Sequence, residues 1–253
     1  MTNFIEPLVT SRQFHFNRRV ALSDTDPSGR LRLDACARYL QDVAAFDAID
    51  ADISAIGIWL LRKNKIVVEE LPTYGTEVKS MTYLTGSGRA WVERTSVISH
   101  PGSGKALARA KALWVLTSPE TGAPISVPEN LYGIYGPLAT LHKVAIRDGK
   151  RQSLPPEASR FVWQIRISDQ DIRGHLNNAT YLEALEEVLY REGVKLTTNQ
   201  KMKCQITYRE STSYEDPADT YFMISRDSGE QSVNIYFAKN GLVRTSIALK
   251  IEG

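Results

Sequence analysis

The sequence predicts an α+β protein made of two diverged copies of one sheet-and-helix unit. The motif Ser-Asp-x-Asp-x-x-Gly-x-Leu occurs at residues 23–31 and again, without a gap, at residues 168–176, an offset of 145 positions. A second match places residues 66–74 on residues 206–214 at an offset of 140. Because an alternating run, the motif, a helical stretch and the second match recur in the same order, we expect an internal pseudo-dimer rather than a chance similarity.

Each copy begins with a run in which apolar and polar residues alternate, as in a half-buried strand. The apolar positions are Phe14, Phe16, Val20 and Leu22 in the first copy, and Phe161, Trp163, Ile165 and Ile167 in the second. A strand is therefore expected immediately before each motif.

A long helix is expected after each motif, at residues 33–49 and 178–192, with Asp34 or Asn178 as the N-cap. The second helix is largely apolar apart from Glu183, Glu186 and Glu187. Such a helix is expected to be surrounded by protein on most of its circumference.

Hairpin signals separate further antiparallel strands in both copies. They are Gly86-Ser-Gly88 and Gly102-Ser-Gly104 in the first copy, and Asp227-Ser-Gly229 and Asn240-Gly241 in the second. The Asn-Gly pair is the strongest signal, because it favours the type I′ turn whose twist matches the strands.

A segment rich in proline, glycine and charge, roughly residues 136–157, separates the two copies and is interpreted as a linker. It includes the charged run at residues 147–151. We therefore divide the chain into an N-terminal unit at residues 10–135, a linker at 136–159 and a C-terminal unit at 160–253.

Composition is typical of a globular protein, with 253 residues, 42% hydrophobic and 24% charged. The net charge of +2 and the scattered Lys and Arg lack the basic stripe of a nucleic-acid binder. No secretory leader or bilayer-length apolar stretch is apparent, so we expect a cytoplasmic protein without a membrane partner. The two cysteines, Cys36 and Cys204, are too few for a disulfide framework or a cysteine-rich metal site.

The segment Asp171-Ile-Arg-Gly-His-Leu-Asn-Asn-Ala-Thr-Tyr181 resembles the signature Asp-x-Asn-x-His-Val-Asn-Asn-x-x-Tyr of the double hot-dog acyl-acyl-carrier-protein thioesterases of plants and bacteria. In the first copy, Tyr39-Leu-Gln-Asp-Val-Ala44 is similar to the family's Tyr-Leu-Gln-Glu-x-Ala helix. The resemblance spans roughly residues 14–250. It implies two tandem hot-dog units, each a long helix wrapped by a curved antiparallel sheet. It also implies hydrolysis of fatty acyl-acyl-carrier-protein thioesters without a cofactor or metal.

Two departures from the family pattern affect the expected chemistry. Arg173 stands at the position of the family's Asn, and Glu210-Ser211 corresponds to its Glu-Cys pair. A cysteine nucleophile is therefore not expected, and Cys204 lies six positions before Glu210. A shifted alignment would put Ser211 at the Glu position, but we prefer Glu210 because its match to Glu70 needs no gap.

Hydrolysis of a thioester needs a carboxylate to activate water or to attack, and donors aimed at the developing oxyanion. We assign Asp171 as the carboxylate, His175 as a positioning or acid–base group, and Glu210 as a residue that orients or activates water. Backbone N–H groups at the start of the helix at Asn178 are the expected oxyanion donors. Asp26 is the main rival carboxylate, and both aspartates could instead cap their turns.

The expected substrate contacts are Arg173, Asn177, Asn178 and Ser211. Arg173 is interpreted either as a ligand of the phosphopantetheine phosphate or as a solvated cation, and the two asparagines either as contacts or as turn and cap residues. His175 is favoured as functional, because Arg30 stands at its position in the first copy. The other histidines are interpreted as surface or structural residues: His15, His100 and His142.

The expected partner is an acyl-carrier protein bearing a phosphopantetheine thioester; a homodimer is left open. Because carrier proteins are acidic, cations near the second-copy entrance are candidates for docking: Lys195, Lys201, Lys203 and Arg209. An acyl-CoA thioesterase is the enzymatic alternative, since it cleaves the same thioester. A hot-dog dehydratase or hydratase would pair Asp and His five positions apart around Asn-Pro, whereas Asp171 and His175 are four apart. A non-catalytic acyl-thioester binding protein is the remaining alternative.

Overall fold

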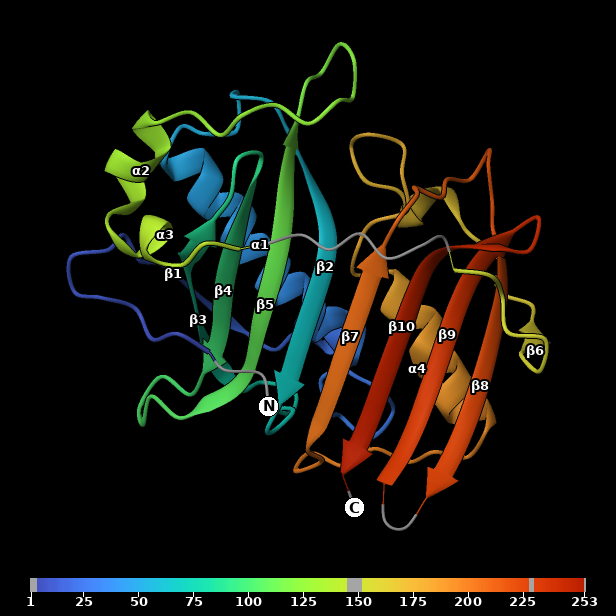
Figure 1. The fold of residues 1–253 in the computed structure, drawn as a ribbon. Helices are drawn as coiled ribbons and strands as arrows, with labels where there is room; N and C mark the ends of the chain where they lie inside the picture. The colour runs from blue at the N-terminus through green and yellow to red at the C-terminus, as the bar shows by residue number, and fades with distance from the viewer. Residues whose placement is uncertain (1–3, 145–151, 228–229, 253) are drawn as a thin grey trace.

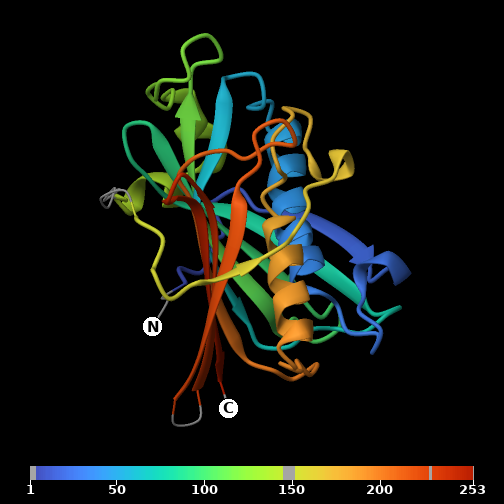
Figure 2. The same cartoon turned by 90° about the vertical axis from the view of Figure 1, so that its right-hand side faces the viewer.

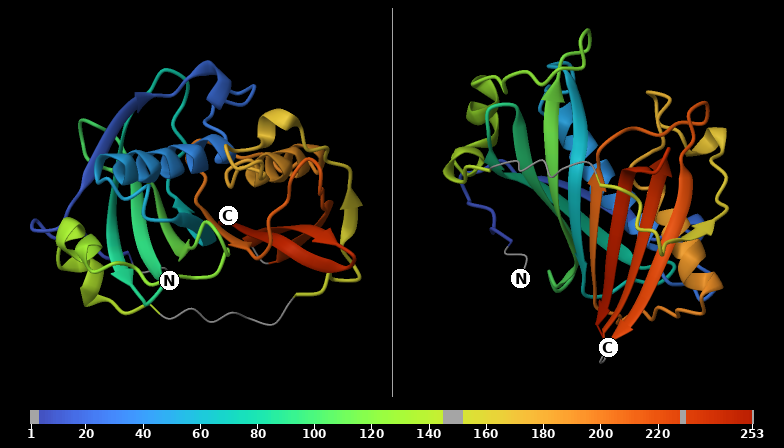
Figure 3. Two further views of the ribbon diagram at one scale, coloured as in Figure 1. Left: turned by 90° about the horizontal axis from the view of Figure 1, so that it is seen from above. Right: turned by 45° about the vertical axis from the view of Figure 1, so that its right-hand side comes forward.

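A computed structural model describes residues 4–144, 152–227 and 230–252. In these residues ten strands form one antiparallel sheet in the order β1-β3-β4-β5-β2-β7-β10-β9-β8-β6, so each copy supplies one half of the sheet (Figure 1). The long helices α1 (Leu33–Asp50) and α4 (Tyr181–Arg191) lie nearly in line on one face of that sheet (Figure 2). Seen from above, the sheet bends around them (Figure 3). The predicted α+β class with two tandem units is confirmed.

The strands have similar lengths in both copies except that β6 and β7 are shorter than their counterparts β1 and β2. The first copy contains β1 (Phe14–Arg19), β2 (Ile58–Val68), β3 (Glu77–Ser87), β4 (Trp91–Ser99) and β5 (Ala106–Thr117). The second contains β6 (Ser159–Phe161), β7 (Met202–Tyr208), β8 (Asp219–Asp227), β9 (Glu230–Lys239) and β10 (Leu242–Glu252). The remaining elements are the short helices α2 (Asn130–Tyr135) and α3 (Leu138–Leu141) and the 3-10 turns η1 (Leu22–Asp24) and η2 (Ile167–Asp169).

The two copies join through the antiparallel pair β2 and β7. Ile66 faces Cys204, and Asn64 faces Ile206. Ile206 lies 140 positions after Ile66, and Cys204 lies 140 positions after Asn64. Exchanging the two copies therefore reproduces the same residue pairs. The predicted offset of 140 is therefore confirmed, and a pseudo-twofold axis passes between the two strands.

On the helix layer, the same axis passes between Arg38 of α1 and Glu183 of α4, which are 145 positions apart. Their Nη1 and Oε1 atoms are 3.6 Å apart. Identical copies would place identical side chains together at this point. Divergence into Arg and Glu replaces a like pair by an ion pair, which a homodimer of identical copies could not do.

The repeated motif forms the same turn in both copies. Gly29 and Gly174 have φ angles of 82° and 70°, a left-handed conformation that glycine adopts without a Cβ penalty. Their N–H groups donate to the carbonyl oxygens of Asp26 (2.9 Å) and Asp171 (3.0 Å). The predicted equivalence of the two turns is confirmed.

The predicted strands before the motifs extend too far. Leu22 and Ile167 lie in the 3-10 turns η1 and η2 and are 74% and 68% exposed. The strand β6 ends at Phe161, although Ile165 beyond it is still buried. Alternating burial therefore continues for four residues without ladder hydrogen bonds. Period-2 hydrophobicity alone cannot distinguish a paired strand from such an unpaired extended segment.

The Asn-Gly hairpin is confirmed: Asn240 and Gly241 connect β9 to β10 with φ angles of 52° and 74°, as a type I′ turn requires. Part of the Asp227-Ser-Gly229 signal lies outside the described residues, as does the charged run at 147–151. The predicted linker at residues 136–159 begins with the helix α3, because buried Leu138 packs against the sheet. None of the described helices is long and apolar enough to cross a bilayer.

Candidate active site

A cavity of about 490 Å³ lies where the second-copy turn faces the first copy. All seven residues predicted for the site line it: Asp171, Arg173, His175, Asn177, Asn178, Glu210 and Ser211. They come from the turn before α4 and from the chain after β7. The structure therefore brings the whole predicted set together at one cavity.

The opposite part of the cavity is formed by the first copy and is mainly apolar. Side chains from α1, the sheet and α2 contribute, among them Ile53, Trp59, Leu84, Val92, Trp114 and Leu131. This wall was not predicted as part of the site. An apolar pocket with polar groups at one end suits a ligand with an aliphatic chain and a reactive head.

Asp171 has the same turn contacts as its counterpart Asp26. Its Oδ1 atom accepts hydrogen bonds from the N–H groups of Arg173 (2.9 Å) and His175 (3.3 Å). The Oδ1 atom of Asp26 accepts from the N–H groups of Ser28 (2.9 Å) and Arg30 (3.0 Å). The turn-capping interpretation therefore applies to both aspartates, and any catalytic difference must come from their surroundings.

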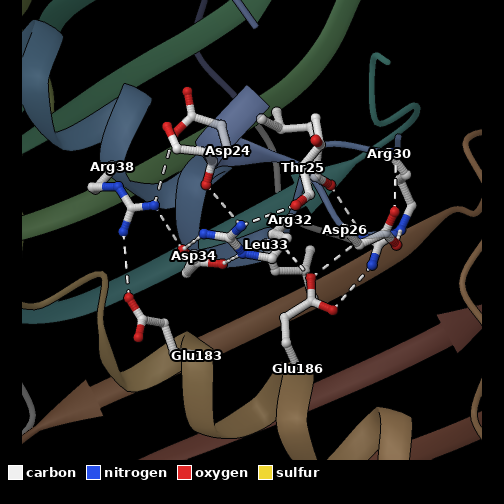
Figure 4. A network of polar contacts seen from close by, with 12 residues as sticks. Asp24, Thr25, Asp26, Arg30, Arg32, Leu33, Asp34, Arg38, Glu183 and Glu186 are labelled. Carbon is white, nitrogen blue, oxygen red and sulfur yellow. Dashed lines mark hydrogen bonds and ion pairs between the residues drawn. The ribbon is translucent and has the colours of Figure 1, made fainter. Parts of the chain in front are cut away.

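Those surroundings differ sharply, and Figure 4 shows those of Asp26. In the first copy Arg30 is only 4% exposed, and it binds Asp26 Oδ2 through Nε (2.9 Å) and Glu186 through Nη2 (3.0 Å). In the second copy exposed His175 takes the place of Arg30 and lines the cavity. The first-copy turn is thus filled by its own ion pairs, whereas the second-copy turn is open to a ligand. This difference favours Asp171 over Asp26 as the functional carboxylate.

The predicted N-caps are wrong at both helices. The helix α4 begins at Tyr181, three residues after Asn178, and its N-cap is Thr180. The residues before it form a separate turn, because the Asn177 Oδ1 atom accepts the N–H of Ala179 (2.9 Å). Asp34 lies inside the first turn of α1, where its buried carboxylate binds neighbouring arginines. The N–H groups next to the cavity therefore belong to the turn before α4 and not to the helix end itself.

Glu210 and Ser211 both line the cavity just beyond β7. The N–H groups of Arg209 and Glu210 donate to one carbonyl, that of Arg244, at 2.8 and 3.2 Å. Glu69 and Glu70 donate to the Leu107 carbonyl in the same way, at 2.8 and 3.1 Å. This repeated pattern supports the alignment in which Glu210 is the counterpart of Glu70.

Arginines line the cavity alongside Asp171 and Glu210, and some of these arginines were not predicted. Arg173 is exposed, and its Nη1 group is 3.4 Å from the Trp59 carbonyl oxygen; Arg62 donates to the Arg209 carbonyl at 2.8 Å. All three arginines line the cavity. A cationic mouth of this kind suits an anionic substrate.

Lys201 and Lys203 were predicted near the entrance, which is wrong. Lys201 directly precedes β7 and Lys203 is the second residue of that strand; Lys203 precedes Glu210 by seven residues, roughly 23 Å at about 3.3 Å per residue. Lys203 pairs with Glu252 instead. Within the described part of the chain, Arg209 is the only one of the four cations proposed for docking that lines the cavity.

Both cysteines are buried away from solvent, Cys36 at 1% and Cys204 at 4% exposure. Burial raises the pKa of each thiol to about 12, so both stay protonated at neutral pH and are poor nucleophiles. Among the described residues, no group of three His, Cys, Asp or Glu side chains is arranged to hold a metal ion.

Replacing both Cys36 and Cys204 by alanine is expected to change kcat by less than about twofold, because a buried, protonated thiol takes no part in the reaction. A tenfold change would require ~1.4 kcal/mol of barrier. Steady-state kinetics of the variant would test this, with the melting temperature as the control for packing. A loss of activity in a variant that melts normally would contradict the assignment.

Comparison with known proteins supports the same reading of the fold. Residues 11–135 match the family model of the acyl-ACP thioesterase N-terminal domain, and residues 154–248 match that of the C-terminal domain. A structure of an oleoyl thioesterase from Lactobacillus plantarum superposes with a TM-score of 0.82 at 15% identity, covering 96% of this chain and 97% of the other. The 12:0-ACP thioesterase from Umbellularia californica gives a TM-score of 0.72 at 18% identity, covering 95% and 94%. The double hot-dog fold expected from the resemblance is therefore confirmed.

Two curated relatives match this chain over less than half of their own length. An acyl-[acyl-carrier-protein] hydrolase of Cuphea viscosissima is 26% identical over 68% of this chain, and a palmitoyl-acyl carrier protein thioesterase of Gossypium hirsutum is 22% identical over 70%. The match spans only 42% and 44% of these two proteins. Since the two family models together cover most of the sequence, the chain belongs to the acyl-ACP thioesterase family.

Proposed function

We propose that the protein hydrolyses fatty acyl thioesters of acyl-carrier protein to the free fatty acid and the carrier thiol. The observation that carries the proposal is the cavity of about 490 Å³, which joins an apolar first-copy wall to the polar second-copy turn. The fatty acyl chain would lie against the wall, and the thioester carbon would lie near Asp171. The names of the curated relatives, acyl-[acyl-carrier-protein] hydrolase and palmitoyl-acyl carrier protein thioesterase, point to the same substrate class.

The proposed reaction adds one water across the thioester. Asp171, helped by Glu210, removes a proton from water as its oxygen attacks the carbonyl carbon. N–H groups of the turn before α4 stabilise the oxyanion of the tetrahedral intermediate. When the carbon–sulfur bond breaks, the proton that the carboxylate took from water passes to the leaving thiolate, directly or through His175, and the carboxylic acid product is released.

An acyl-CoA thioesterase remains the second candidate, because coenzyme A presents the same phosphopantetheine arm. The cationic mouth formed by Arg62, Arg173 and Arg209 suits both substrates. An acyl-carrier protein adds further negative charge outside the mouth, so it should gain more from these arginines.

A charge reversal, Arg173→Glu, is expected to lower kcat/KM for an acyl-carrier-protein thioester by about tenfold or more at low salt, and for the coenzyme A thioester of the same chain by less. Lys203→Glu, at the far end of β7, is the matched control and should leave both values near those of the wild type. A wild-type preference for coenzyme A would assign the protein as an acyl-CoA hydrolase. Tight binding of both thioesters without turnover would favour a binding protein.

A further inference from the structure

Each long helix supplies one side chain to the turn of the other copy, and the two side chains differ. Glu186 of α4 and Gln41 of α1 occupy equivalent positions, 145 residues apart. Glu186 is fully engaged: its Oε1 atom accepts the N–H of Leu33 at 2.7 Å, and its Oε2 atom accepts from Arg30 at 3.0 Å (Figure 4). In the first copy, therefore, a carboxylate from the partner helix covers the backbone N–H at the end of the turn.

Gln41 reaches the corresponding place in the second copy but does not act in the same way. It lines the cavity together with Asn177 and Asn178. Its Nε2 group is 3.4 Å from Asn177 Oδ1, and its Oε1 atom is buried without a hydrogen-bond partner among the described residues. Asn178 is the counterpart of Leu33, at the offset of 145. By the symmetry of the two copies, the facing helix offers this second-copy N–H a neutral amide at the position where the first copy has the carboxylate of Glu186.

An N–H group in this place can serve a ligand only if nothing in the protein occupies it. A carboxylate at position 41 would compete for that N–H and would repel the negative charge that develops on a thioester oxygen. A neutral glutamine avoids the repulsion. Its contact with Asn177 through Nε2 keeps the side chain next to the turn, where its Oε1 atom does not accept that N–H. The pair Gln41 and Glu186 therefore distinguishes the open turn from the closed one.

We propose that Gln41 is a positioning residue of the thioester site: it supports the turn through Asn177 and leaves the Asn178 N–H open for the carbonyl oxygen of the substrate. The inference rests on the proposed function, because the substrate is the acyl thioester assigned above. It also assigns a role in the second-copy site to a residue of the first copy, which makes the site dependent on both halves of the chain.

Gln41→Glu tests the inference because it introduces the side chain found in the closed turn. Losing one preorganised oxyanion donor is expected to lower kcat by roughly 100-fold at about pH 8, with a much smaller change in KM. The melting temperature should be unchanged or higher, because the new carboxylate would bind the Asn178 N–H. As the pH falls toward the pKa of the new carboxyl group, activity relative to the wild type should recover, since the protonated side chain is neutral and close in shape to glutamine.

Two controls separate positioning from structure. Glu186→Gln makes the reciprocal change in the closed turn and should lower the melting temperature while leaving kcat close to the wild-type value. Gln41→Met keeps the length of the side chain without the amide and should lower kcat by about tenfold without acid recovery, a loss of ~1.4 kcal/mol. Wild-type turnover by Gln41→Glu at about pH 8, or a kcat loss that does not respond to pH, would overturn the inference while leaving the proposed function intact.

A binding measurement covers the case in which the wild type shows no hydrolysis. The probe is a ketone analogue of an acyl-pantetheine, in which a methylene group replaces the sulfur and the carbonyl is retained. Calorimetry should show at least about tenfold weaker binding to Gln41→Glu than to the wild type at neutral pH, equivalent to ~1.4 kcal/mol. Equal affinities would overturn the role of Gln41. A wild type that neither hydrolyses the thioester nor binds the ketone would overturn both the inference and the proposed function.

Discussion

Replacing Asp171 by asparagine is expected to lower kcat by about two to four orders of magnitude, the usual contribution of a general base. The fold should be preserved, because asparagine keeps the Oδ1 acceptor that the N–H groups of Arg173 and His175 use. What is lost is the negative charge that removes a proton from water. The measurement is kcat at saturating acyl-carrier-protein thioester, with the melting temperature of the same sample.

Asp26→Asn is the matched control in the closed turn. It also keeps an Oδ1 acceptor, but its new amide group would face the Nε group of Arg30, which now donates to Oδ2 at 2.9 Å. We therefore expect a lower melting temperature and a nearly unchanged kcat. Comparable losses of kcat in the two variants would contradict the assignment, and would mean that the motif is structural or that both turns act.

Local backbone chemistry explains why the repeated turn could be predicted from the sequence. A left-handed glycine, a preceding aspartate and a following apolar residue determine one turn, so Gly29 and Gly174 give the same conformation in both copies. The start of α4 was predicted less well, because the side chain of Asn177 forms its own turn. Such side-chain competition with the helix leaves no clear sequence signal.

The apolar wall of the cavity could not be predicted in the same way. It depends on which faces of α1 and of the first-copy strands meet the second-copy turn, and that is a property of packing between segments distant in sequence. The error at Lys201 and Lys203 has a related cause: proximity to Glu210 along the chain was taken as proximity in space. An extended strand instead separates its two ends by the greatest distance that its residues allow.

A buried charge cluster in the first copy also went unpredicted, since its members come from separate segments. Asp47 of α1 is fully buried, and Arg94 of β4 is 5% exposed. Asp47 accepts from Arg94, from Arg12 Nε (2.8 Å) and from the hydroxyl of Tyr135 (2.7 Å). Burial raises the pKa of Tyr135 to about 12, so this hydroxyl stays protonated and can donate. Arg94 also lines the cavity, whereas Arg12 of the same cluster does not.

Replacing Arg94 by methionine is therefore expected to lower the free energy of unfolding by about 3–5 kcal/mol, because it leaves the carboxylate of Asp47 buried without its main partner. Urea denaturation of the variant and the wild type gives this difference. The double variant Arg94→Met/Asp47→Leu removes the stranded charge as well and should recover a large part of the loss, since an apolar pair of similar volume is often as stable as a buried ion pair. Arg160→Met, which removes an exposed pair with Asp219, is the surface control and should cost no more than about 1 kcal/mol. A loss at Arg94 no larger than at Arg160 would mean that water reaches Asp47, and the cluster would then contribute little to the stability of the first copy.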